Sequence, residues 1–126
     1  MRIVGHGIDL VEVARIEAIL DRHGDRFLAR VFTPAEAAQS EGRRRRAEHL
    51  AGRFAAKEAV LKALGTGLDS GIAWTEIEVV PSPRGQPTVR LVGRAAAIAR
   101  ELGIGSWSLS ISHTSAQAAA SAIAIG

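Results

Sequence analysis

Cysteine and tyrosine are absent from this sequence of 126 residues, and other aromatic side chains are few. Without cysteine the chain forms no disulfide framework, thiolate metal site or cysteine nucleophile, and it is compatible with a reducing cytoplasm. It contains two tryptophans and three phenylalanines, although 47% of its residues are hydrophobic. We therefore expect a core of aliphatic and alanine side chains, with some apolar surface left for contacts between subunits.

Long hydrophobic runs are also absent. The longest lies near residues 118–125, well short of the roughly 20 residues that a membrane-spanning helix needs. Residues 1–4 are followed at once by Gly5, so they are too short for the core of a signal peptide. We expect a soluble, cytoplasmic protein with no membrane partner.

Lysine is scarce in a chain that is basic overall. Lys and Arg together number 16 against 13 Asp and Glu, a net charge of +3, yet the only lysines are Lys57 and Lys62. The length and the hydrophobic fraction exclude intrinsic disorder and fit one domain over residues 1–126.

Hydrophobic periodicity and turn signals predict an α+β fold, with a small, mostly antiparallel sheet packed against three to four helices. Asp9 with Glu12 has the spacing of a capping box at the start of a first helix that Gly24 would end. Thr33 with Glu36 has the same spacing at the start of a second. Further helices are expected over 47–64 and 94–102, and strands over 2–8, 75–80, 87–92 and 106–113. The apolar stretch over 118–125 fits a buried strand or a helix, and we favour a strand.

The predicted helix over 47–64 contains the strongest candidates for functional residues. Lys57 falls within its apolar stripe and Glu58 on the edge of that stripe. Because an isolated buried charge is very costly, both should be paired or functional. One interpretation is a Glu58–Lys62 pair at i, i+4. The apolar stripe consists of Leu50, Phe54, Leu61 and Leu64. The opposite side of the helix is made of small residues, so other elements could approach it closely: Ala55, Ala56, Ala59 and Ala63.

Asp9 and Glu58 have a second interpretation as oxygen ligands of a metal ion. Magnesium takes one or two carboxylates and completes its shell with water and phosphate oxygens. The four histidines do not have the spacing of a zinc site. Spacing alone does not choose between this interpretation and a helix cap at Asp9 with a helix-stabilising pair at Glu58.

Two further features have both a structural and a functional interpretation. His113 ends an alternating strand in phase with its apolar face, so it is either a partly buried, hydrogen-bonded side chain or a phosphate contact or proton relay. Gly65, Thr66 and Gly67 either end the helix before them or cradle a phosphate with their backbone amides.

Arginines form two groups, Arg15 with Arg22 on the first helix and residues 43–46 in a loop. They are either solvated or dock an acidic partner. A nucleic-acid-binding module is an alternative from another class, against which the interleaved acids and the scarcity of aromatics and lysine argue. A third alternative is an oligomerisation domain without catalysis.

Several segments, in this order, resemble the holo-acyl-carrier-protein synthases, the small bacterial 4′-phosphopantetheinyl transferases. The resemblance covers essentially the whole chain and implies the fold of that family. The matching segments are residues 7–13 (GIDLVEV), 30–33 (RVFT) with Glu36, 54–59 (FAAKEA), 62–67 (KALGTG), 77–79 (IEV) with 85–87 (GQP), and 110–113 (SISH).

The resemblance implies a transferase that moves the 4′-phosphopantetheine group of coenzyme A to a serine hydroxyl of an acidic apo-acyl carrier protein. Adenosine 3′,5′-bisphosphate is the other product, and Mg²⁺ is required. The family implies fatty acid and lipid biosynthesis in the cytoplasm, no nucleic acid partner, and a homotrimer with active sites between subunits. The residues do not separate fatty-acid from polyketide carriers, Mg²⁺ from Mn²⁺, or coenzyme A from its acylated forms.

Residue by residue, the resemblance implies that Asp9 and Glu58 are the metal ligands and that Arg15 and Arg22 dock the carrier protein. The acceptor of the serine proton stays open between Glu58 and a metal-bound water. Thr114 stands where some members carry an acid, which argues against a third carboxylate ligand. The implied catalytic residues are Glu58, Lys62 and His113, and the implied coenzyme A contacts are Arg53, Lys62, Gly65, Thr66, Gly67 and His113.

Overall fold

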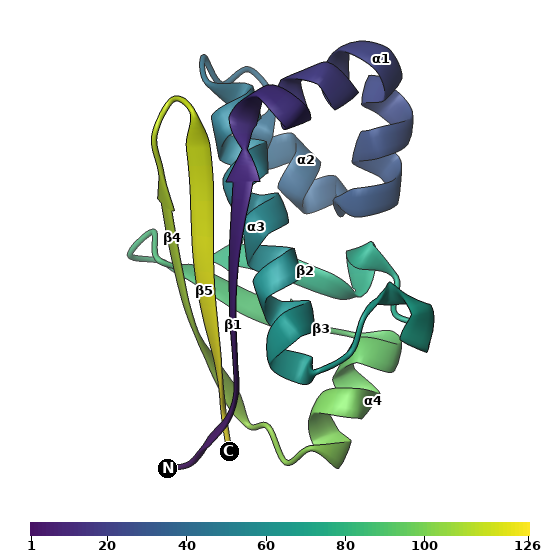
Figure 1. Cartoon of the computed structure of the whole chain (residues 1–126), viewed down its shortest axis with the longest axis vertical. Coiled ribbons are helices and arrows are strands. Elements are labelled where there is room, and N and C mark those ends of the chain that lie inside the picture. The colour runs from purple at the N-terminus through teal and green to yellow at the C-terminus, as the bar shows by residue number, and fades with distance from the viewer.

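A long central helix lies against one face of a three-stranded antiparallel sheet (Figure 1). The computed structural model describes residues 1–126 apart from the side chain of Asp69. The strands are β1 (Ile3–Glu12), β2 (Ile77–Pro81), β3 (Pro87–Leu91), β4 (Ser106–His113) and β5 (Gln117–Ile125). The helices are α1 (Val13–Val31), α2 (Pro34–Ser40), α3 (Arg46–Leu64) and α4 (Gly93–Glu101), with the short 3₁₀ turns η1 (Leu68–Ser70) and η2 (Trp74–Glu76). The predicted α+β class is confirmed.

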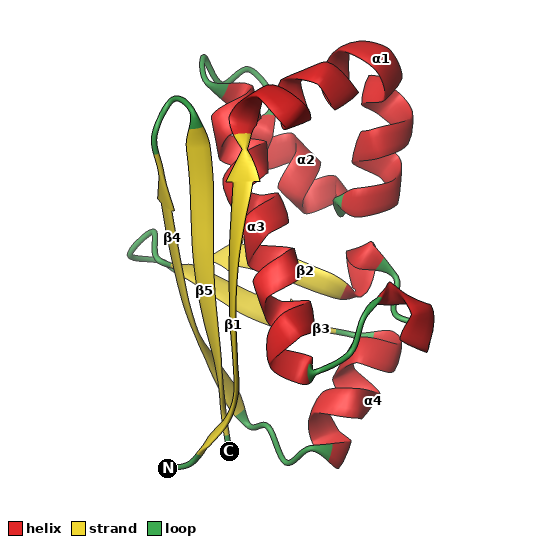
Figure 2. Cartoon of the chain, viewed as in Figure 1, coloured by secondary structure: helices red, strands yellow, loops and turns green.

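The larger sheet has the strand order β1-β5-β4, and β2 and β3 form a separate hairpin (Figure 2). The tail at 118–125 is a strand, as predicted, and lies in the middle of this sheet. Its alternate alanines pack under α3, while Ile8 and Leu10 on the neighbouring strand β1 point to the other face and are 63% and 62% exposed. All four helices lie on the α3 side (Figure 1), so this second face of the sheet carries exposed apolar side chains that no helix covers.

Glycines on β1 allow α3 to lie directly on the sheet. A Cβ atom at Gly5 would overlap the carbonyl oxygen of Ala63, and one at Gly7 would overlap that of Ala59. The close approach predicted on the alanine side of α3 is therefore confirmed. This contact holds the C-terminal half of α3 beside residues 7–9 of β1.

The predicted start and end of the first helix are wrong. Strand β1 pairs with β5 as far as Glu12 opposite Gln117, so Asp9 is a strand residue and α1 begins only at Val13. Glu12 occupies the N-cap position and makes no side-chain cap bond. The chain also continues past Gly24, with non-helical backbone at His23 (φ −140°, ψ 33°). Sheet pairing and packing of the second half of α1 outweigh these local signals.

The predicted start of α2 and the predicted end of α3 are confirmed. The Thr33 hydroxyl accepts a hydrogen bond from the Glu36 amide (3.2 Å), and the Glu36 carboxylate accepts one from the Thr33 amide (2.9 Å), which is the predicted capping box of α2. Helix α3 ends at Gly65, whose φ of 75° is left-handed. Within the described residues, no helix is both long and apolar enough to cross a membrane.

Candidate active site

Asp9 and Lys62 meet where β1 crosses the last turns of α3. Asp9 lies on the face of β1 that packs against α3, next in that alternation to the buried Gly7 and Val11. The Lys62 ammonium lies 3.1 Å from the Asp9 carboxylate and also donates a hydrogen bond to the Ile8 carbonyl (2.9 Å). Lys62 therefore bonds to β1, whereas the sequence suggested Glu58, one helical turn away, as its partner.

Glu58 lies close enough to Asp9 for their charges to interact. Burial raises the pKa of Glu58 above its usual value, and the negative charge of Asp9 raises it further. The positive charges of Lys62 and Arg15 oppose that shift. Two carboxylates that repel each other make a site that a cation would stabilise.

The donor set at this point fits Mg²⁺. It consists of two carboxylates and no sulfur or imidazole, and a magnesium ion needs one or two such ligands from the protein. Among the described side chains, no group of three or more His, Asp or Glu residues converges. The remaining ligands of an ion here would be oxygens of water or of a bound phosphate.

A pocket of about 410 Å³ opens beside Glu58. Thr66 and Gly67 line it, but Gly65 does not. The amides of Gly65 and Thr66 donate to carbonyls of the last turn of α3, which is the helix-ending role that the sequence left open for this segment. The lining residues are Glu58, Leu61, Lys62, Thr66, Gly67, Leu68 and Trp74.

His113 lies at the other end of α3. Its Nδ1 is 3.4 Å from the Glu48 carboxylate. Glu48 and Glu58 are ten residues apart on one helix, which corresponds to about 15 Å along its axis. A single chain therefore does not bring His113 to the pocket beside Glu58.

A second pocket, of about 300 Å³, adjoins His113 and is lined by Arg43, Arg44, Arg45, His49 and His113. His49 was not singled out from the sequence, although it lies four residues before Arg53 on α3 and close to the arginine run. Burial lowers its pKa to about 4, and the positive charges of Arg53, Arg43 and His113 contribute. Burial also lowers the pKa of Arg53, with a further contribution from Arg43.

Arg15 and Arg22 are exposed on α1. The Arg15 guanidinium lies over the ring of Phe54, 5.9 Å from its centroid, and its charge influences Glu58. Helix α1, on which the carrier protein is expected to dock, therefore places Arg15 near Glu58.

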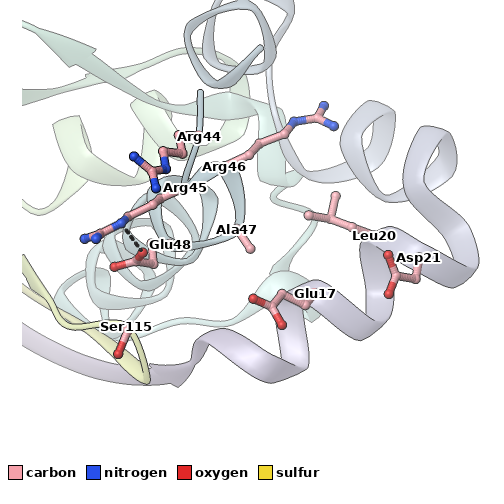
Figure 3. Close-up of a pocket in the computed structure, with 9 residues that line it drawn as sticks. All are labelled: Glu17, Leu20, Asp21, Arg44, Arg45, Arg46, Ala47, Glu48 and Ser115. Carbon is pink, nitrogen blue, oxygen red and sulfur yellow. Dashed lines mark ion pairs between the residues drawn. The ribbon is translucent and has the colours of Figure 1, made fainter. Parts of the chain in front are cut away.

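A third pocket, of about 570 Å³, lies between α1 and the arginine loop (Figure 3). Glu17 and Asp21 face it from α1, and Arg45 pairs with Glu48 at 3.6 Å. Acidic side chains thus lie beside the arginine run, which does not favour the nucleic-acid interpretation. The predicted metal ligands do not line this pocket, whose lining is Glu17, Leu20, Asp21, Arg44, Arg45, Arg46, Ala47, Glu48 and Ser115.

Lys57 is fully buried and paired, as its position in the apolar stripe required. Its partner is Glu36, at 2.8 Å between the ammonium and the carboxylate. The sequence did not indicate this partner, because the two residues are 21 positions apart. Lys57 contacts the same Glu36 oxygen that accepts the capping-box hydrogen bond from the Thr33 amide, so the capping box gave no separate signal of this pair.

Comparison with known proteins places these residues in a family. A family model described as the 4′-phosphopantetheinyl transferase superfamily matches residues 5–121. The holo-[acyl-carrier-protein] synthase of Koribacter versatilis is 48% identical over 121 residues, covering 96% of this chain and 97% of that protein.

Solved structures agree with the sequence comparison. The crystal structure of holo-[acyl-carrier-protein] synthase from Neisseria meningitidis has a TM-score of 0.89 and 32% identity, covering 99% of this chain and all of that one. The Helicobacter pylori synthase in complex with coenzyme A has a TM-score of 0.84 and 32% identity, over 95% of this chain and 99% of that one.

Proposed function

The chain belongs to the 4′-phosphopantetheinyl transferase superfamily, and we propose that it acts as a holo-acyl-carrier-protein synthase. It transfers the 4′-phosphopantetheine group of coenzyme A to a serine hydroxyl of an apo-acyl carrier protein and releases adenosine 3′,5′-bisphosphate. The observation that carries this proposal is that Glu58 and Lys62 line the pocket beside Trp74, while Asp9 pairs with Lys62 and its charge acts on Glu58.

Asp9 and Glu58 would hold the magnesium ion. When bound, the ion supplies positive charge that stabilises the phosphate oxygens as the phosphoanhydride bond breaks. Lys62 serves both metal binding and phosphate binding. In the absence of a metal ion its ammonium neutralises Asp9. When Asp9 binds a cation instead, that ammonium is free to contact a phosphate oxygen of coenzyme A.

We propose that the functional unit is a homotrimer with its active sites between subunits. Two observations support it. On the uncovered face of the sheet, the large apolar side chains of Ile8 and Leu10 are 63% and 62% exposed beside the serines of β4, and burying them against further copies of the chain would remove them from water. His113 and Arg53 are predicted to contact coenzyme A, but neither lines the pocket beside Glu58, and His113 lies at the other end of α3, so a second subunit would supply them.

The carrier protein would dock on α1. Arg15 and Arg22 are exposed there, and Arg15 influences Glu58. An acidic carrier bound along this helix would bring its serine to the pocket. We place the reaction in fatty acid and lipid biosynthesis in the cytoplasm.

Mass spectrometry of a carrier protein tests this function. The protein is incubated with coenzyme A, Mg²⁺ and an apo-acyl carrier protein, and the carrier should gain the mass of one phosphopantetheine group. Chelation of the metal should abolish the gain. A carrier that a known synthase modifies, but that this protein leaves unmodified under the same conditions, would contradict the proposal.

A further inference from the structure

A buried ion pair lies directly behind the pocket. Lys57 and Glu36 are 0% and 1% exposed, and Lys57 is the residue before Glu58 on α3. The Lys57 ammonium contacts one Glu36 oxygen at 2.8 Å. The other Glu36 oxygen accepts a hydrogen bond from the Val79 amide at 2.8 Å. The pair therefore joins α3 and α2 to strand β2.

Lys57 also binds both ends of the turn η2. Its ammonium donates to the carbonyl of Trp74, at 3.1 Å, and to the carbonyl of Ile77. Trp74 is the first residue of η2 and Ile77 the residue after its last. The three donors of one ammonium group thus have three fixed acceptors, which hold this turn against α3.

The turn carries one wall of the pocket. The Trp74 side chain lines the pocket together with Glu58, and its ring packs on Phe54 with centroids 5.1 Å apart. The position of this wall relative to Glu58 depends on the Lys57 contacts to η2. Phe54 restrains the ring itself.

Stability alone is a weak explanation for the pair. Burial lowers the pKa of Lys57, and the nearby carboxylate of Glu36 only partly opposes this. Apolar side chains that fill the same volume often give equal or greater stability than a buried ion pair. What apolar side chains do not supply is a set of directed bonds to the carbonyls of η2.

We propose that Lys57 and Glu36 are positioning residues that hold the Trp74 wall of the pocket in place for coenzyme A. The inference rests on the proposed function for the identity of the ligand. Neither residue contacts the reacting groups, since both are enclosed behind the wall. Their loss should therefore weaken the binding of coenzyme A more than it slows the bound reaction.

The main test is the double variant Glu36→Gln/Lys57→Met, which removes both charges together and leaves neither one buried alone. We expect KM for coenzyme A to rise about tenfold while kcat changes less than about threefold. KM for the carrier protein should stay unchanged. The control is Ile16→Ala, a fully buried residue of α1, which should lower the melting temperature and leave KM for coenzyme A unchanged at temperatures where it is folded.

A second measurement follows Trp74 itself. In a Trp107→Phe background Trp74 is the only tryptophan, so its fluorescence reports on this wall. Acrylamide should quench it more strongly in the double variant than in Ile16→Ala at matched fractions of folded protein. If the double variant does not fold, Glu36→Asp, which keeps both charges but shortens the reach of the carboxylate, should shift quenching and KM in the same directions.

Unchanged KM and quenching in the double variant, or the same changes in Ile16→Ala, would overturn the inference. Failure of the proposed function is distinguishable, because the unsubstituted protein would then modify no carrier. Trp74 quenching would still report whether the ion pair holds the wall.

Discussion

Lys62 on α3 and Asp9 on β1 form an ion pair at 3.1 Å, and the lysine is the more exposed partner, at 54% of its side chain against 15%. The contact joins the predicted phosphate-binding residue to one predicted metal ligand. Because the Asp9 carboxylate is already neutralised, a divalent cation has to compete with the ammonium for it. Binding of a metal ion to Asp9 should therefore be coupled to release of the Lys62 ammonium from Asp9.

Lys62→Gln tests this coupling. Without the ammonium, Asp9 should bind Mg²⁺ more tightly in the absence of coenzyme A, while the affinity for coenzyme A falls about tenfold. Calorimetric titration of each ligand separately measures both effects. Lys62→Arg, which keeps the charge, should stay closer to the unsubstituted protein in both titrations, and a loss of Mg²⁺ affinity in Lys62→Gln would contradict the coupling.

Gly7→Ala tests whether the contact between α3 and β1 holds the site together. The added methyl would overlap the Ala59 carbonyl oxygen, and backbone on both sides leaves little room to relax. We expect a loss of about 3 kcal/mol of stability and a melting temperature lower by about 10 °C.

Gly24→Ala is the matched control for that substitution. A Cβ at Gly24 meets nothing within 4 Å, and the residue lies inside α1, so alanine should stabilise the protein by about 0.5–1 kcal/mol. Thermal unfolding compares the two. Equal melting temperatures would show that the close approach on β1 does not constrain α3.

His49 should make stability depend on pH. Its pKa is about 4 in the folded protein, against an ordinary value of 6.5 for histidine, so the unfolded chain takes up the proton first as the pH falls. Its contribution is fully present above about pH 6.5 and is progressively lost between there and pH 4. His49→Phe should show a smaller fall in melting temperature from pH 7 to pH 4.5, and parallel curves for the two proteins would contradict this.

Arg15→Ala and Arg22→Ala test the docking face of α1. Each should raise KM for the carrier protein about threefold to tenfold at low salt, and the difference should shrink at high salt because exposed charges are screened. Steady-state kinetics with a varied carrier concentration measures this. Arg94→Ala, an exposed arginine on α4, should not change KM, and an equal effect there would indicate that net charge alone matters.

The features predicted correctly from the sequence are those that nearby residues determine. The capping box of Thr33 and Glu36 spans one helical turn, and the left-handed Gly65 ends α3 by local backbone geometry. The alternating strand over 106–113 was predicted with its observed bounds, because its period of two residues is unambiguous.

The features that were missed depend on distant partners. Pairing with Gln117 keeps Glu12 in β1, which no residue near Glu12 indicates. Glu36 could not be identified as the partner of Lys57, because the fold alone brings them together. Asp9 and Glu58 were linked through a family resemblance, since spacing did not distinguish them from other pairs of carboxylates.

Binding of Mn²⁺, a spectroscopically visible substitute for Mg²⁺, tests most directly whether Asp9 and Glu58 hold the metal together. Electron paramagnetic resonance titration in the presence of coenzyme A should detect one site per chain in the unsubstituted protein. Asp9→Asn and Glu58→Gln should each weaken that site at least about tenfold, whereas Glu17→Gln on α1 should leave it unchanged. Unaltered Mn²⁺ affinity in Asp9→Asn and Glu58→Gln would contradict the account.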